Sequence, residues 1–157
     1  TTLFRSLKKG CYDFAAITHN ETSTGVENPL IDISNVMKKY SDIIFAVDTV
    51  SSTGGVDIDV DSCKIDFCVT STQKCLGLPP GLSICSLSDK AINRTKYVEN
   101  RGYYLDLLTL YEYTINKDYQ YPATPSLSHM YALDYKLNKI INIEKKENRI
   151  REDNLLD

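Results

Sequence analysis

Residues 65–74 read Ile-Asp-Phe-Cys-Val-Thr-Ser-Thr-Gln-Lys, an apolar run that passes into hydroxyl side chains and ends at a lysine. Upstream, residues 43–48 read Ile-Ile-Phe-Ala-Val-Asp, a second apolar run that ends at a carboxylate. Short apolar runs of this kind are typical of buried strands. In open α/β sheets, ligands bind just beyond the carboxyl ends of the strands. The two runs therefore predict a site that offers an amine from Lys74 and a carboxylate from Asp48.

The rest of the chain alternates between strand and helix patterns. We expect strands at 13–18 (a buried one), 43–47, 67–70 and 82–87. We expect helices at 33–41, after a cap at Ser88-Asp89, at 104–115, and at 126–148. The last is amphipathic, with one apolar face made by Tyr131, Leu133, Leu137, Ile140, Ile141 and Ile143. This alternation predicts an α/β fold with a mostly parallel sheet and flanking helices.

The composition excludes several classes of function. The 157 residues are 42% hydrophobic and 25% charged, with a net charge of −3, so neither nucleic acid nor a membrane is an expected partner. No apolar stretch approaches the roughly 20 residues of a membrane span. The five cysteines form no Cys-x-x-Cys pair, which favours reduced thiols and a cytoplasmic protein. We assign no metal ligand.

Three polar stretches would meet where the strands end. They are residues 19–25 (His-Asn-Glu-Thr-Ser-Thr-Gly), residues 47–52 (Val-Asp-Thr-Val-Ser-Ser), and residues 71–74, closed by the turn 79–81 (Pro-Pro-Gly). A lysine for a Schiff base and an acid for a pyridinium nitrogen are what pyridoxal 5'-phosphate (PLP) needs from a protein. Taken singly, each residue has a plainer interpretation. A lysine after a strand is most often solvated, and an aspartate there most often shapes a turn.

The order and spacing of these stretches resemble the class V aminotransferases of PLP fold type I, especially the alanine–glyoxylate and serine–pyruvate branch. The resemblance runs from about residue 12 to residue 145. It implies that the chain is part of a large PLP-binding domain and acts as a transaminase. It also implies a small amino acid, alanine or serine, as donor and glyoxylate or pyruvate as the 2-oxo acid acceptor.

The resemblance also implies a role for each matching residue. Lys74 would form the Schiff base with PLP and then, as a neutral amine, move the α-proton of the substrate. Asp48 would pair with the pyridine nitrogen, and Val50 would pack on one ring face. Thr22, rather than Ser23, would bond near the ring oxygen.

Two further elements would bind the cofactor phosphate. Gln73 would approach it within the same chain. Residues 121–124 (Tyr-Pro-Ala-Thr) match the family's Tyr-x-x-Thr element, in which Tyr121 and Thr124 would reach the phosphate of a neighbouring subunit. This match implies a homodimer with shared sites. His19 and His129 have a structural rather than a catalytic interpretation.

Three alternatives stay open. A 2-aminoethylphosphonate–pyruvate aminotransferase shares the Glu-Thr-x-Thr-Gly element at 21–25 and the Lys74-Cys75 pair, whereas Gln73 and the turn 79–81 fit the alanine–glyoxylate branch better. A cysteine desulfurase would place histidine where Gln73 stands. A truncated remnant without catalysis is the non-enzymatic alternative.

Parts of the family pattern fall outside the 157 residues. These are an upstream glycine-rich turn for the phosphate, an upstream aromatic residue that stacks on the ring, and a downstream arginine for the substrate carboxylate. We therefore treat residues 1–157 as a partial PLP-binding domain. We expect this segment alone to fold poorly and not to transaminate, because an incomplete sheet exposes an unpaired edge and an apolar face.

Overall fold

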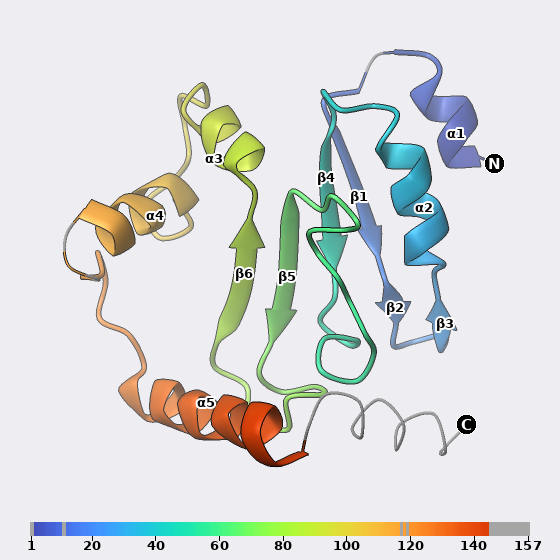
Figure 1. Ribbon diagram of the computed structural model, residues 1–157. Coiled ribbons are helices and arrows are strands. Elements are labelled where there is room, and N and C mark those ends of the chain that lie inside the picture. The colour runs from blue at the N-terminus through green and yellow to red at the C-terminus, as the bar shows by residue number, and fades with distance from the viewer. Residues whose placement is uncertain (1, 11, 117, 119, 145–157) are drawn as a thin grey trace.

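Four strands form the main sheet of the computed structural model, which describes residues 2–10, 12–116, 118 and 120–144. Their order across the sheet is β1, β4, β5, β6. The first two pairs are parallel and the last is antiparallel, so in Figure 1 β1, β4 and β5 point one way and β6 the other. Their bounds are β1 (Phe14–Thr18), β4 (Ile44–Asp48), β5 (Phe67–Ser71) and β6 (Ser83–Leu87). The predicted mostly parallel α/β sheet is confirmed, with strand bounds within one residue.

Helices flank this sheet, and a short hairpin follows β1 (Figure 1). The hairpin pairs β2 (Asn20–Glu21) with β3 (Val26–Glu27) in antiparallel fashion. This hairpin was not predicted from the sequence. The helices are α1 (Thr2–Leu7), α2 (Leu30–Met37), α3 (Asp89–Thr95), α4 (Leu107–Asn116) and α5 (Leu127–Lys139), which continues into a π-helical turn, η1 (Ile140–Glu144).

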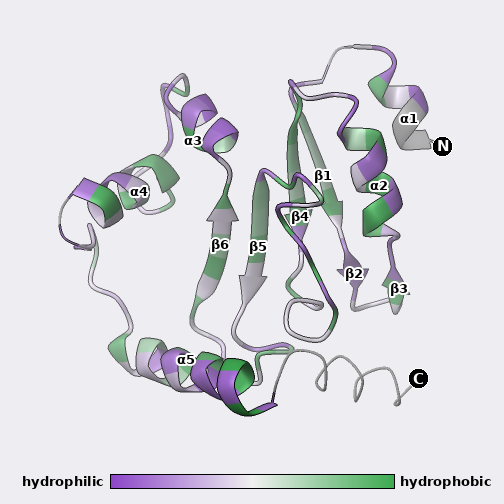
Figure 2. Ribbon diagram, viewed as in Figure 1, coloured by the Kyte–Doolittle hydropathy of each residue, from purple (hydrophilic) through white to green (hydrophobic). Residues whose placement is uncertain are grey.

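The apolar core covers one face of the sheet. Phe45 and Val47 of β4 are 2% and 1% exposed and pack with Leu30 and Met37 of α2. Figure 2 shows hydrophobic colouring along most of β4. Side chains alternate across a strand, so Ile44 and Ala46 point to the opposite face. Their partners in β1, Phe14 and Ala16, point to that face as well.

That opposite face is open at β1. Phe14 is 56% exposed and Ala16 is also exposed, while Ala15 and Ile17 pack against the core. The prediction of a buried strand at 13–18 was therefore wrong: β1 is an edge strand with one covered face. A shallow cavity of about 360 Å³ lies on the open face, bordered by Phe14, Ala16 and Asp48 among others.

Two helices begin at residues other than those predicted, because the residues just before them set the first turn. The expected helix at 33–41 begins earlier, at Leu30, because Pro29 lacks an amide hydrogen and fits just ahead of a first helical turn. Ser88 caps α3 as predicted, since its side chain accepts a hydrogen bond from the Ala91 amide. The helix expected at 104–115 begins only at Leu107, after Asp106.

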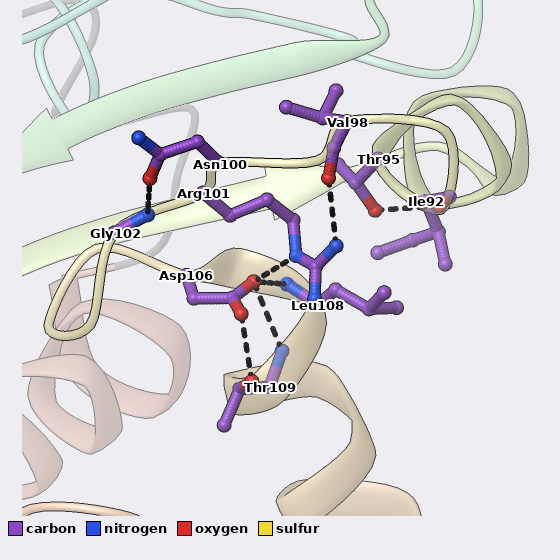
Figure 3. A network of polar contacts seen from close by, with 9 residues as sticks. All are labelled: Ile92, Thr95, Val98, Asn100, Arg101, Gly102, Asp106, Leu108 and Thr109. Carbon is purple, nitrogen blue, oxygen red and sulfur yellow. Dashed lines mark hydrogen bonds and ion pairs between the residues drawn. The ribbon is translucent and has the colours of Figure 1, made fainter.

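Asp106 sets the start of α4 (Figure 3). Its Oδ1 accepts from the amides of Leu108 and Thr109, and Arg101 Nε donates to the same oxygen at 2.9 Å. Burial raises the pKa of Asp106, but the hydrogen bonds from Thr109 and Arg101 outweigh it and hold that pKa below its usual value. The carboxylate therefore stays charged and orders the connection from α3 to α4.

The long helix expected at 126–148 is shorter and less covered than predicted. It leaves α-helical geometry after Lys139, and residues 145–148 lie outside the described part of the chain. Its expected apolar face is largely exposed in this chain: Tyr131 is 74% exposed and Ile141 70%. Among the residues that the structure describes, every helix is too short or too polar to pass through a lipid bilayer.

Candidate active site

Asp48 ends β4 and is fixed by both neighbouring strands. Its carbonyl accepts from the His19 amide at 2.8 Å, and the next amide, of Thr49, donates to Val69 O at 2.8 Å. Its Oδ1 accepts from the Val50 amide at 2.8 Å. Oδ2 has no hydrogen-bond partner among the described residues, and the half-buried side chain borders the shallow cavity on the open face. One carboxylate oxygen is thus available to a ligand.

The turn after Asp48 is held by a fully buried hydroxyl. Thr49 is 0% exposed and donates from Oγ1 to Val69 O at 2.9 Å. Thr53 Oγ1 in turn donates to Thr49 Oγ1 at 2.6 Å. Val50, predicted to pack on a ring face, sits half-buried in this turn. Buried, fully bonded hydroxyls of this kind make a turn rigid, which keeps the Asp48 carboxylate in one direction.

The loop after β5 carries Lys74 and is closed by the Pro-Pro-Gly turn. Thr72 is 0% exposed, and its Oγ1 donates to Pro79 O at 2.8 Å. The Leu78 amide donates to Thr72 O at 3.0 Å. Lys74 and Gln73 are exposed, and their side chains have no hydrogen bond among the described residues. A rigid frame therefore presents an unengaged amine and an unengaged amide to solvent.

Ser51 contacts the segment that follows β1 and the loop that follows β5. Its Oγ hydrogen-bonds Thr22 Oγ1, in the segment that follows β1. Its carbonyl accepts from Cys75 Sγ at 3.3 Å, in the loop that follows β5. Ser51 itself lies in the turn that follows β4. The structure thus brings the Thr22, Asp48 and Lys74 segments into one contiguous cluster.

The charges within this cluster are also coupled. Glu21 Oε1 accepts from the backbone amide and the hydroxyl of Ser23 at 2.9 and 2.7 Å. These bonds lower the pKa of Glu21, and the positive charge of Lys74 lowers it further. An anion therefore stands near the lysine on the β1 side of the cluster.

Tyr121 and Thr124 lie apart from this cluster. Both are on the segment between α4 and α5, where Tyr121 is 57% exposed and Thr124 is also exposed (Figure 1). That segment leads into α5, where His129 Nε2 meets Pro80 O at 3.0 Å and Nδ1 meets Ser126 Oγ at 2.8 Å. The described contacts connect it to the Pro-Pro-Gly turn, not to Asp48 or Thr22.

Ser51 and Ser71 were given no role by the sequence. Ser51 stands in the quoted Val-Asp-Thr-Val-Ser-Ser stretch, but its junction role depends on contacts across three strand exits. Ser71, at the end of β5, has a 7% exposed side chain whose hydroxyl lacks a partner among the described residues. Two larger cavities, of about 560 and 660 Å³, are lined by neither Asp48 nor Lys74.

Comparison with known proteins identifies the family. The profile of the family described as aminotransferase class-V matches residues 2–157. The chain belongs to the class-V aminotransferase family. It is 46% identical over 142 residues, 88% of the chain, to an aminotransferase of Methanocaldococcus jannaschii. It is 35% identical over 144 residues, 86% of the chain, to alanine–glyoxylate aminotransferase 1 of Saccharomyces cerevisiae.

The fold agrees with this assignment. The crystal structure of alanine–glyoxylate aminotransferase from Nostoc sp. superposes with a TM-score of 0.86 at 30% identity, over 95% of this chain and 39% of that one. The predicted fold type I architecture and the alanine–glyoxylate branch are thus confirmed. The chain spans 36% and 37% of the lengths of the two curated relatives.

The residues of the cluster fit the cofactor that this family implies. PLP has an aldehyde, a basic ring nitrogen and a phosphate. The cluster offers an unengaged amine, a carboxylate with one unbonded oxygen, and the amide and hydroxyls of Gln73, Thr22 and Ser71. The carboxylate borders the open-face cavity, where a flat ring would find apolar neighbours.

Proposed function

We propose that this chain is part of the large PLP-binding domain of an aminotransferase that moves an amino group from a small amino acid to a 2-oxo acid. The observation that carries the proposal is the convergence at Ser51, which gathers an amine, a carboxylate and hydroxyl donors at the exits of three adjacent segments. Family membership over residues 2–157 supports the same activity.

When bound, the cofactor supplies the electron sink that lets an amino acid lose its α-proton. Lys74 would supply the amine that holds the cofactor as a Schiff base. As a free amine, Lys74 would also carry the proton at the substrate α-carbon.

The remaining residues bind and orient. Asp48 would pair with the ring nitrogen through its unbonded Oδ2 and keep that nitrogen protonated, and Val50 would pack on one ring face. Thr22 would donate to the ring oxygen, and Gln73 would donate to the phosphate. Neutral donors of this kind bind phosphate oxygens without adding charge.

Tyr121 and Thr124 are assigned to the phosphate of a partner subunit. The exposure of Tyr121, and the absence of any described contact from either residue to the Ser51 junction, support a role outside their own site. We therefore propose that the active form is a homodimer whose two sites are each built from both chains.

The donor is assigned as alanine or serine and the acceptor as glyoxylate or pyruvate. The similarity to the yeast and Nostoc alanine–glyoxylate enzymes supports this choice. The test offers each donor with each acceptor to the full-length protein that contains this chain, purified with PLP, and measures the 2-oxo acid formed. Turnover with these pairs is expected, and no turnover with any of them would overturn the assignment.

2-Aminoethylphosphonate with pyruvate is the second candidate, favoured by the Glu-Thr-x-Thr-Gly element at 21–25 and by Cys75 next to Lys74. Including this pair in the same panel decides between the two. A protein that binds PLP at no lysine would instead support the non-enzymatic remnant.

A further inference from the structure

His19 is the most enclosed polar side chain at the β1 exit and has no role in the chemistry above. It follows β1 directly and is 3% exposed. Burying a polar ring costs free energy unless its nitrogens find partners, so the contacts of a buried histidine indicate what it holds in place. Its partners here belong to the segments that carry the candidate site.

The main chain of His19 joins the two strand exits. Its amide donates to Asp48 O at 2.8 Å, and its carbonyl accepts from the Asn28 amide at 2.7 Å. Asn28 Nδ2 also donates to Thr18 O at 2.8 Å. These bonds fix the position of the His19 backbone, and the ring therefore starts from a well-defined point.

The ring reaches across to the turn that follows Asp48. Nδ1 lies 3.0 Å from Ser52 Oγ, and Ser52 is 2% exposed. The Ser52 amide donates to Thr49 O at 3.0 Å, and the amides of Gly55 and Val56 both donate to Ser52 O. Ser52 is thus the residue on which the turn from Thr49 to Val56 closes.

The far side of the ring faces a weaker partner. Nε2 lies 3.6 Å from Glu27 Oε1, and the Glu27 side chain is 59% exposed. Burial lowers the pKa of His19, although the Glu27 carboxylate raises it in part. A neutral ring can give Ser52 a single well-oriented hydrogen bond, as donor or as acceptor according to its tautomer.

We propose that His19 is a positioning residue: through Nδ1 and Ser52 it fixes the turn that aims Asp48 and presents Val50. The proposal rests on the proposed function. It goes further by assigning the direction of the carboxylate to a buried link between the β1 exit and the β4 exit. The neighbouring Thr22–Ser51 contact joins the same two segments closer to the lysine, and the two links act in parallel.

The test uses side chains that mimic one ring nitrogen at a time. His19→Asn keeps a polar atom near the Nδ1 position, whereas His19→Gln reaches towards the Nε2 position. Ser52→Ala removes the other half of the link. Ser62→Ala is the matched control, because it removes a side-chain hydrogen bond of 2.7 Å, to Asp59, that touches neither turn nor lysine loop.

The full-length protein that contains this chain is measured with PLP in each form. The readouts are the dissociation constant for PLP, the pH at which the absorption of the bound cofactor changes, and the thermal midpoint without PLP. His19→Gln and Ser52→Ala are each expected to weaken PLP binding roughly tenfold, about the worth of one buried hydrogen bond, and to shift the absorption titration. His19→Asn and Ser62→Ala should stay within about twofold of the parent.

The combined His19→Gln and Ser52→Ala form should lose little more than either single form, because both changes break one link. Fully additive losses would overturn the proposal, as would equal losses for Asn and Gln at position 19. A drop in thermal midpoint with an unchanged absorption titration would show a purely structural histidine and overturn it too. If the parent protein binds no PLP, the proposed function itself fails, an outcome distinct from all of these.

Discussion

The strand-exit cluster and the 121–124 segment carry the same kind of side chain in opposite settings. In the cluster, the exits of β1, β4 and β5 are bonded to one another through Ser51, and Thr49 and Thr72 are wholly buried. Tyr121 is exposed, and the contacts of its region run through His129 to Pro80. The strand-exit cluster is therefore assembled within a single chain, whereas the 121–124 segment lies apart from the cluster of its own chain.

The largest expected effect comes from a substitution of Asp48, the acid of the cluster. Asp48→Asn keeps the shape and the acceptor for the Val50 amide but removes the negative charge that we propose to face the ring nitrogen. We expect kcat to fall by about 10²–10³-fold, the usual loss when one preorganised electrostatic partner is removed. Steady-state kinetics of the full-length protein measure this.

Asp61→Asn is the control for Asp48→Asn, because Asp61 is an exposed aspartate that lines a cavity at the other end of the sheet. It should leave kcat unchanged. A near-parental kcat for the Asp48→Asn protein would mean that the cluster does not hold the ring nitrogen at this position.

The second prediction concerns the contact between the Pro-Pro-Gly turn and α5, which connects the two regions. A Cβ added at Gly81 would overlap the His129 ring at Nε2. Gly81→Ala should therefore lower the free energy of unfolding by about 1–3 kcal/mol, as overpacking does. Adding His129→Ala should restore part of that loss. Chemical denaturation of the four forms in the cycle measures the coupling.

Gly102→Ala is the matched control for backbone strain, since Gly102 also has a positive φ, of 74°, but has nothing within 4 Å of the added carbon. If Gly81→Ala costs no more than Gly102→Ala, or if His129→Ala restores nothing, then α5 is not seated on the Pro-Pro-Gly turn as described.

How far the sequence predicted these features depends on whether each one is local. The strands β4 and β5 follow from unbroken apolar runs, and Asp48 and Lys74 follow from where those runs end. Residues 14–17 also form an apolar run, yet Phe14 is open to solvent while Ile17 is packed. The difference arises from what covers each face of β1, which no local pattern encodes.

In the candidate site, too, local features were predicted and contacts between distant residues were not. Thr22, Asp48, Gln73 and Lys74 were proposed from motif and order, and the structure places their segments together. The junction at Ser51 and the link from His19 to Ser52 depend on contacts between residues that lie 24 to 33 positions apart. The start of α2 at Leu30 was missed because the helix was predicted from the spacing of its apolar residues alone. Pro29, which favours a helix start just after it, was not considered.

The third prediction tests whether the hydroxyls of the 121–124 segment serve a partner. Changing Tyr121→Phe and Thr124→Val together removes the two hydroxyls that we propose as neutral donors to the partner's phosphate. We expect PLP binding to weaken roughly tenfold, with kcat at saturating PLP little changed. Titration of the apoprotein with PLP at two protein concentrations, alongside sedimentation, measures affinity and assembly.

In the same experiment, the parent protein should bind PLP more weakly once dilution separates the subunits, and the doubly substituted protein should show less of that dependence. PLP affinity that is independent of subunit assembly, with no effect of the two substitutions, would place the whole phosphate site within one chain.

The smallest expected effect concerns pH. Burial lowers the pKa of His19 from the ordinary value of 6.5, so the unfolded chain takes up a proton before the folded chain does. The stabilisation from the neutral ring is therefore present above pH 6.5 and is lost as pH falls below it. Parent and His19→Asn proteins should diverge in thermal midpoint on acidification, with the parent losing more.

The charged groups around the ring are common to both proteins, so the difference between the two curves reports on His19. These groups are Glu27 and, around the adjoining cavity, Asp32, Lys38, Asp57 and Asp59. Parallel curves from about pH 8 to about pH 5 would contradict the assignment of a neutral, buried His19.

The most direct test of the central claim is to locate the lysine that holds the cofactor. The full-length protein containing this chain is loaded with PLP, reduced with borohydride, digested, and its peptides are sequenced by mass spectrometry. We predict a pyridoxyl group on Lys74 and none on the exposed Lys64. The label should be lost in a Lys74→Ala form that keeps its fold. A pyridoxyl group on a different lysine, or on none, would contradict the claim that the Ser51 junction assembles a PLP site.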